Sequence, residues 1–241
     1  MKKGFLTILM AMVAISIWAV DLPKQGFGLQ IGFARPTLRL NSPSIAYPKD
    51  SLVNTTYLNG FKIGVTYDAS YVAGFGSSIG INYTFAARSR DWKKKANDLS
   101  HSERSTITYH QIEIFVDWQY KFELAKETYL MLYSGPTMQY GIAFNKHILE
   151  REDFYEQITK DETYNRYTTD IADERIRNLN ITWGVGAGFQ YQRYFLRGGY
   201  DFGLFNPYKY THFEASSDDR YTRGRFDQWS IKIGMYLWYG E

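Results

Sequence analysis

The chain has 241 residues and a net charge of +3, with 28 Lys and Arg residues against 25 Asp and Glu residues. This small, scattered excess of positive charge gives no support for nucleic-acid binding. The absence of cysteine excludes disulfides and thiolate metal sites. Aromatic residues make up 18% of the sequence, beside 20 glycines and only 6 prolines, and this composition favours β-structure.

The first residues predict a signal for export. Lys2 and Lys3 precede a largely apolar run over residues 4–19. The run is shorter than the ~20 residues that a membrane-spanning helix needs. A secretory signal peptide over residues 1–19 therefore explains it better than a transmembrane anchor does, and we expect one mature domain over residues 20–241.

Eight segments of the mature chain alternate between apolar and polar residues, which predicts eight β-strands. In chain order they cover residues 27–34, 60–68, 75–85, 111–122, 130–144, 179–191, 196–204 and 229–239. In the last of them, WSIKIGMYLWY, the odd-numbered residues are apolar and Lys232 lies at the centre of the other face. No charged residue occurs on any of the eight apolar faces. The fifth segment is the least regular, because Pro136 predicts a local irregularity in its ladder.

The connections between these segments alternate in length. Three are only a few residues long, at residues 69–73, 123–128 and 192–194. Four are long, at residues 35–57, 86–109, 145–177 and 206–227. Short turns on one side and long loops on the other describe an antiparallel up-and-down meander whose two ends face different compartments. An even number of strands places both chain ends on the short-turn side.

Eight antiparallel strands close into a barrel whose interior is filled by side chains, and two kinds of barrel fit this count. In a soluble ligand carrier of the lipocalin kind the apolar faces point inward, whereas in a transmembrane barrel they point outward. Each apolar face spans ~9 to 11 residues, the length that a tilted strand needs to cross a bilayer. Aromatic residues gather near the ends of these faces, which favours the transmembrane barrel.

The pattern resembles the small eight-stranded outer-membrane β-barrel proteins of bacteria. This group includes the outer membrane protein A transmembrane domain, the X-type barrels, the opacity adhesins and the broad outer membrane protein beta-barrel domain group. The last strand, with an aromatic residue at Tyr239, is similar to their C-terminal assembly signal, although Gly240 and Glu241 follow it. The resemblance implies a monomer in the cell outer membrane, in contact with lipopolysaccharide and the barrel assembly machinery, whose outer loops carry its function.

Eight charged residues lie on the faces that would line the lumen, and their signs balance. They are Lys62, Lys121, Arg197, Lys232, Asp68, Glu113, Asp117 and Asp201. Charges in a narrow interior of low dielectric constant must be paired. We therefore expect a salt-bridge network that plugs the barrel, with Asp201 and Lys232 as one of its pairs. A narrow, porin-like channel is the alternative.

Two of the long connections are rich in charge. Residues 86–109 have an excess of basic residues. This excess predicts a binding site for phosphate groups or an anionic polymer, formed by Arg88, Arg90, Lys93, Lys94 and Lys95. The alternative is that these charges only keep a solvent-exposed loop soluble and bind no ligand. Residues 145–177 carry nine carboxylates against six Lys and Arg residues but lack the glycine of an EF-hand, so we expect no metal. Tyrosines in the outer loops suit contact with an extracellular ligand or a host surface, and these loops would equally extend the barrel as strands outside the membrane.

An enzyme that modifies lipid A is the least favoured hypothesis. His212, Glu214 and Ser216 alternate onto one face of an extended segment, but at ~7 Å apart along a strand they are too distant for a proton relay. No phosphate-binding loop or zinc motif occurs in the sequence, so we expect no cofactor. The sequence favours a non-enzymatic protein with a structural, adhesive or envelope-integrity role.

Overall fold

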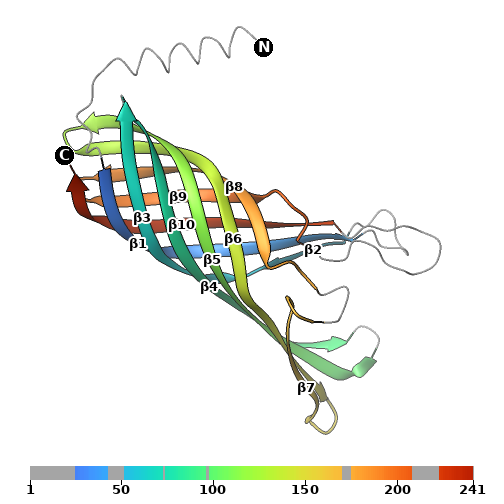
Figure 1. The fold of residues 1–241 in the computed structure, drawn as a ribbon. Helices are drawn as coiled ribbons and strands as arrows, with labels where there is room; N and C mark the ends of the chain where they lie inside the picture. The colour runs from blue at the N-terminus through green and yellow to red at the C-terminus, as the bar shows by residue number, and fades with distance from the viewer. Residues whose placement is uncertain are drawn as a thin grey trace.

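A computed structural model describes residues 25–42, 52–72, 74–95, 98–169, 175–207 and 223–240 of the chain (Figure 1). The predicted signal peptide, residues 1–19, and the residues His212, Glu214 and Ser216 lie outside these ranges. Within them, no helix is long and apolar enough to cross a membrane.

The described residues form ten β-strands. Their bounds are β1 Gln25–Ser42, β2 Leu52–Tyr57, β3 Asn59–Val72, β4 Phe75–Lys95, β5 Asp98–Ala125, β6 Thr128–Glu152, β7 Gln157–Asn165, β8 Leu179–Tyr191, β9 Tyr194–Gly203 and β10 Arg223–Gly240.

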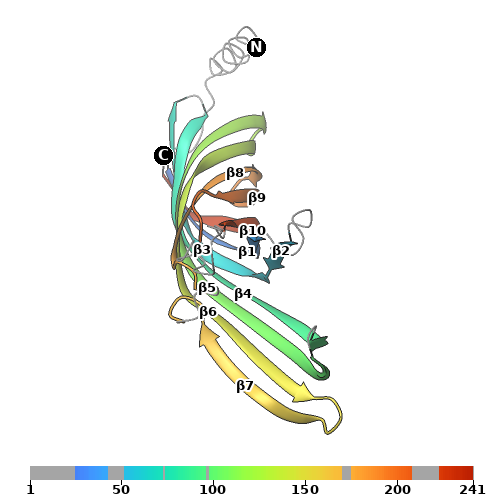
Figure 2. The same cartoon turned by 90° about the vertical axis from the view of Figure 1, so that its right-hand side faces the viewer.

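Eight of these strands form a closed antiparallel barrel. Hydrogen bonds join β10, β9, β8, β6, β5, β4, β3 and β1 in that order, and β1 pairs with β10 to complete the ring. The views in Figure 1 and Figure 2 show the strands running up and down around one axis. Gln25 pairs with Gly240, so both ends of the described chain lie beside the short turns. The predicted eight-stranded up-and-down barrel is confirmed.

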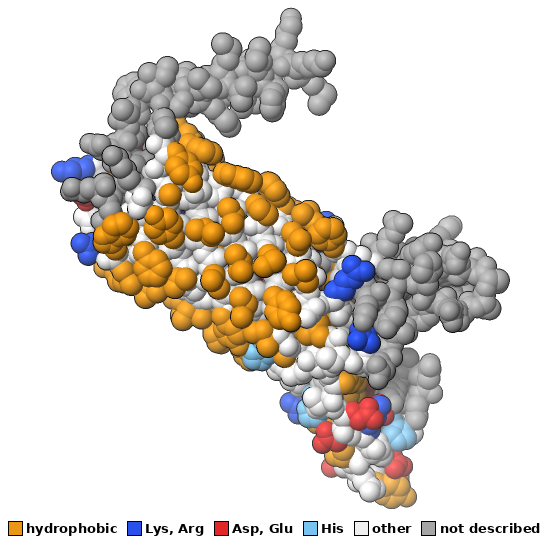
Figure 3. Space-filling view, viewed as in Figure 1, with side chains coloured by type: hydrophobic (Ala, Val, Ile, Leu, Met, Phe, Trp, Pro, Cys, Tyr) orange, Lys and Arg blue, Asp and Glu red, His pale blue; other side chains and the backbone are white. Residues whose placement is uncertain are grey.

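The apolar faces of the barrel strands point outward. Ile63 and Ile233 are 49% and 58% exposed, whereas their neighbours Lys62 and Lys232 are buried. Figure 3 shows the apolar side chains gathered in a band over the barrel wall. A soluble carrier would have the reverse arrangement, so the outward orientation predicted from the sequence is correct.

Two β-bulges reverse the predicted side-chain direction near strand ends. Ile142 is an extra, unpaired residue of β6 in its ladder with β5, and Phe144, predicted to face outward, is fully buried. Leu237 is extra in the ladder between β1 and β10, and Trp238, predicted to face inward, is half exposed. One extra residue moves every later side chain to the other face of the sheet, which explains both errors.

The irregularity predicted at Pro136 is present on one side of β6. In the described pairing, no residue of β5 pairs with Gly135 or Pro136, whereas the ladder with β8 runs through both residues. Proline has no N–H group to donate, so it interrupts one of the two ladders of a central strand.

Two of the predicted outer loops are mostly strand. Beyond the apolar band, β4 and β5 continue as a pair, and β6 continues to pair with β7. Figures 1 and 2 show these strands projecting from one end of the barrel. We call them the outer sheet, which consists of residues 89–95, 98–108, 145–152 and 157–165. The alternative that these segments extend the barrel as strands is therefore the correct one.

Candidate functional site

The inner half of the lumen holds a charge cluster centred on Asp68. Its carboxylate lies 2.6 Å from Arg197 Nη2 and 3.3 Å from Lys121 Nζ. The hydroxyl groups of Ser78, at 2.7 Å, and Tyr236 donate to the same carboxylate. All five side chains are buried, so one carboxylate with several donors stabilises two cations that lack bulk water.

A second cluster is centred on Glu113. Lys62 Nζ lies 2.6 Å from one carboxylate oxygen. The other oxygen accepts hydrogen bonds from Thr84 at 3.0 Å, from Gln228 at 2.8 Å and from Gln111. Most of these side chains come from the neighbouring strands β3, β4 and β5, whereas Gln228 comes from β10 on the opposite side of the ring. The cluster therefore ties the barrel wall together across its lumen.

The predicted ion pair between Asp201 and Lys232 is wrong. Among the described residues no ion pair joins them, and Lys232 Nζ lies 5.1 Å from the ring centroid of Phe115. The register of β9 and β10 places Arg197 opposite Lys232 and Gln228 opposite Asp201. The two charges are therefore four residues out of register.

Asp117, Asp201 and Lys232 line a small polar cavity beside the Glu113 cluster. Its volume is about 20 Å³, which is room for about one water molecule. Buried charges are stabilised by neighbouring hydrogen-bonding groups, by water or by one another's electric field. The cavity is too small for a solute.

Apolar side chains close the lumen at both ends. The inner end is packed by Met131, Phe195 and Tyr236. The outer end is packed by Leu38, Leu58, Ala86, Ile107, Tyr109, Phe144, Ile176 and Phe226, with Tyr167 against them. Ile176 and Tyr167 come from the described parts of the connection between β7 and β8. The charged layers therefore lie between two apolar layers.

Sequence reasoning missed the uncharged members of the lumen clusters. Ser78, Thr84, Gln111, Gln228 and Tyr236 each donate to a buried carboxylate. Each lies on the inward face of its strand, so a survey of all polar inward residues would have found them. Which of them meet across the lumen depends on the ladder register and on side-chain conformation.

The five basic residues predicted to bind an anion all lie on β4. Arg90, Lys93 and Lys94 are exposed on the outer sheet, with Lys93 opposite Glu103 of β5. Arg88 instead turns toward Tyr57, and nothing is described of the Lys95 side chain. None of the ion pairs between described residues involves the three exposed cations.

The opposite edge of the outer sheet carries ion pairs near β7. His147 Nε2 lies 2.9 Å from an Asp161 oxygen, and Lys160 Nζ lies 3.0 Å from Glu162. The hydrogen bond to Glu162 raises the pKa of Lys160. Within the described part of the chain, no group of three or more His, Asp or Glu residues is placed to hold a metal ion.

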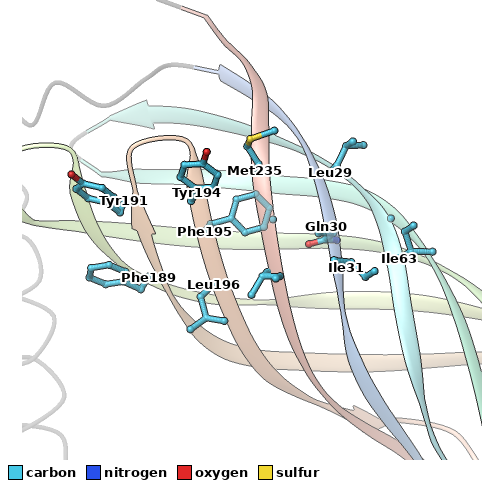
Figure 4. Close-up of a pocket in the computed structure, with 13 residues that line it drawn as sticks. Leu29, Gln30, Ile31, Ile63, Phe189, Tyr191, Tyr194, Phe195, Leu196 and Met235 are labelled. Carbon is cyan, nitrogen blue, oxygen red and sulfur yellow. The ribbon is translucent and has the colours of Figure 1, made fainter.

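An apolar groove of about 620 Å³ crosses the outer wall of the barrel (Figure 4). Its lining includes Leu29, Ile31, Ile63, Phe189 and Leu196. Outward-facing residues of five strands border it, so in a bilayer it opens toward the hydrocarbon. In a bilayer, acyl chains would fill such a groove, and its few polar lining side chains, Gln30, Tyr191 and Tyr194, give little basis for a specific solute site.

Comparison with known proteins identifies the family. The profile of the family described as "Outer membrane protein beta-barrel domain" matches residues 24–209, which is most of the chain. No curated protein matches the sequence.

Three solved structures are similar in fold. The first is Ail, the attachment invasion locus protein of Yersinia pestis, in complex with the heparin analogue sucrose octasulfate; it is 11% identical, with a TM-score of 0.41 over 89% of this chain and 99% of that chain. Neisserial surface protein A is 13% identical, with a TM-score of 0.38 over 88% and 97%. The N-terminal β-barrel domain of Pseudomonas aeruginosa OprF is 11% identical, with a TM-score of 0.30 over 88% and 98%.

The closed barrel, its outward apolar band and the family match agree with one another. The chain belongs to the outer membrane protein beta-barrel domain family and is an integral protein of the cell outer membrane.

Proposed function

We propose that this chain is a surface-interaction protein without enzymatic activity, in which a closed barrel anchors a contact sheet outside the membrane. The observation that carries the proposal is the length of three barrel strands. β4, β5 and β6 have 21, 28 and 25 residues, whereas ~9 to 11 residues suffice to cross the bilayer. The surplus forms the outer sheet, whose strands are hydrogen-bonded continuations of the barrel wall.

The basic edge of the outer sheet is the proposed contact surface. Arg90, Lys93 and Lys94 follow one another along β4 and lie outside the apolar band. They extend into solvent without an ion pair to a described carboxylate. A row of this kind suits a long anionic polymer, because successive charges of the polymer meet successive cations and release their counterions.

The packed lumen supports anchoring in preference to transport. Two charged clusters and two apolar layers fill the interior, and the cavity beside them has room for about one water molecule. In planar bilayers the purified protein is expected to give no steady conductance. A steady, large conductance would instead support the narrow channel and overturn the closed barrel.

Binding to an anionic polymer tests the proposal directly. The probe is immobilised heparin, with uncharged dextran as the blank, and the protein is the refolded full chain in detergent. Replacing Arg90, Lys93 and Lys94 by glutamine is expected to weaken binding at least about tenfold and to reduce its salt dependence. The matched control replaces Lys146, Arg151 and Lys160, which removes the same charge from the opposite part of the sheet. Equal losses in both variants would mean that only net charge matters.

A further inference from the structure

A second cluster of cations lies at the rim of the barrel, between the apolar band and the outer sheet. Figure 3 shows Lys and Arg side chains directly beside one end of the apolar band. The cluster combines two arginines around one tyrosine with two more arginines around one aspartate. Its members are Arg35, Arg39, Tyr57, Arg88, Arg225 and Asp227, and we call it the rim cluster.

An aromatic girdle fixes the level of the rim cluster in the membrane. The rings of Phe33 and Trp229 lie 5.2 Å apart, and those of Phe61 and Phe85 lie 5.6 Å apart. Paired aromatic rings of this kind mark the boundary between hydrocarbon and headgroups. Arg35 lies opposite Trp229 in the ladder and two residues beyond Phe33 on the same face. Its guanidinium group is therefore placed where lipid headgroups begin.

Two guanidinium groups share one aromatic ring in this cluster. The central guanidinium carbons of Arg35 and Arg88 each lie 4.0 Å from the ring centroid of Tyr57. Arg88 Nη1 also donates to the Tyr57 carbonyl oxygen at 3.5 Å. The separation of the two guanidinium carbons is therefore at most twice their 4.0 Å distance from the ring centroid. Like charges at such a separation repel each other.

The described neighbours of the rim cluster do not neutralise it. Asp227 serves both Arg225, at 2.8 Å, and Arg39, at 3.4 Å, and the Tyr200 hydroxyl donates to the same carboxylate at 3.0 Å. None of the ion pairs between described residues reaches Arg35 or Arg88. Among the described residues the rim cluster therefore holds four guanidinium groups against one carboxylate.

We propose that the rim cluster binds the phosphate groups of an outer-leaflet lipid headgroup. The flat guanidinium group forms paired hydrogen bonds with phosphate oxygens, and Arg35 and Arg88 both contact the same Tyr57 ring. Their level, next to the aromatic girdle, is that of lipid phosphates, whereas a polymer in the medium meets the outer sheet first. This site is separate from the proposed polymer-binding surface, because it uses other residues.

The test measures lipid binding to the refolded full chain in zwitterionic detergent by native mass spectrometry. Lipid A with two phosphates is compared with the same lipid after its phosphates are removed, and inorganic phosphate is added as a competitor. The Arg35→Gln/Arg88→Gln variant is compared with Arg151→Gln/Lys160→Gln, which removes two cations from the outer sheet. Arg151 also lies over an aromatic ring, at 4.7 Å from Trp92, so the control loses a comparable contact.

The wild-type protein is expected to prefer the phosphorylated lipid, and Arg35→Gln/Arg88→Gln to lower that affinity at least about tenfold. The control variant is expected to bind like wild type. If the rim variant does not fold, Arg35→Lys/Arg88→Lys keeps the charge, loses the forked donors and is expected to give an intermediate loss. Equal binding of the lipid without phosphate, unchanged affinity of the rim variant, or complete displacement by inorganic phosphate would each overturn the proposal.

Discussion

The lumen and the outer sheet use the same charged residue types under opposite conditions. In the lumen, Asp68 and Glu113 and their cationic partners are at most 4% exposed. On the outer sheet, Lys160 and Glu162 pair at 3.0 Å with 39% and 57% of their side chains exposed. Water screens the second pair and not the first. Distance alone therefore says little about what an ion pair contributes.

The comparison teaches where the barrel is vulnerable. Breaking a buried pair leaves an uncompensated charge, which typically costs about 3 to 5 kcal/mol, whereas an exposed pair contributes about 0 to 1 kcal/mol. Substitutions in the lumen should therefore act on stability, and substitutions on the outer sheet should act on binding.

The largest effect is expected for Asp68→Asn. The substitution leaves Arg197 and Lys121 without their carboxylate, so we expect a loss of about 5 kcal/mol in the free energy of unfolding, at the upper end of the range for buried pairs. Urea titration of the protein folded in lipid vesicles measures it. The double variant Asp68→Asn/Arg197→Gln should recover part of the loss. Equal stability of wild type and Asp68→Asn would contradict the buried network.

A smaller loss is expected for Lys62→Met. Glu113 then loses its cation but keeps the neutral donors Thr84, Gln111 and Gln228. These donors still stabilise the ionised form of Glu113. We therefore expect a loss of about 3 kcal/mol in the free energy of unfolding, near the lower end of the range for buried ion pairs. The same urea titration gives the value, and a loss larger than that of Asp68→Asn would reverse the ranking of the two clusters.

Glycine positions test how closely the strands pack. A Cβ atom at Gly32 would lie 2.0 Å from the Ile231 carbonyl oxygen, whereas one at Gly198 would have no heavy atom nearer than 4.0 Å. Gly32→Ala should therefore lose about 1 to 3 kcal/mol by overpacking, and Gly198→Ala should be close to neutral. Vesicle refolding of both variants side by side checks the difference, and similar losses would argue against the described register.

The smallest effect is expected for Asp161→Asn on β7. Its partner His147 is solvated, so we expect a change below about 0.5 kcal/mol. Thermal unfolding in detergent at low and high salt is the measurement. A loss of several kcal/mol would show that the outer sheet, and not the lumen, limits stability.

The barrel was predictable because burial by lipid imposes a strict period of two. The alternating positions of apolar residues such as Ile63 and Ile233 correctly predict which face of each strand points outward. The predicted side-chain direction was wrong beyond Ile142 and Leu237, where a β-bulge adds one residue to the strand. The local sequence contains no signal for either bulge. The prediction also failed to define the strands of the outer sheet, because their sequence is mostly polar and shows no apolar alternation.

The lumen was predictable in content but not in pairing. The eight charges lie on inward faces, as parity requires, yet Asp201 and Lys232 do not meet. Ladder register decides which residues are opposite each other, and a shift of four residues separates this pair. Arg88 was predicted to bind an anion, but its position beside Arg35 and Tyr57 was not, because the three residues come from three different strands.

The direction of the side chains along β10 tests the central claim most directly. The chain has no cysteine, so single cysteines can be placed at chosen positions and labelled in vesicles with a lipid-soluble maleimide. We expect labelling at positions 231 and 233, no labelling at positions 230 and 232, and labelling at both 237 and 238 because of the bulge. Labelling at 230 and 232 with protection at 231 and 233 would contradict a barrel whose apolar face meets lipid.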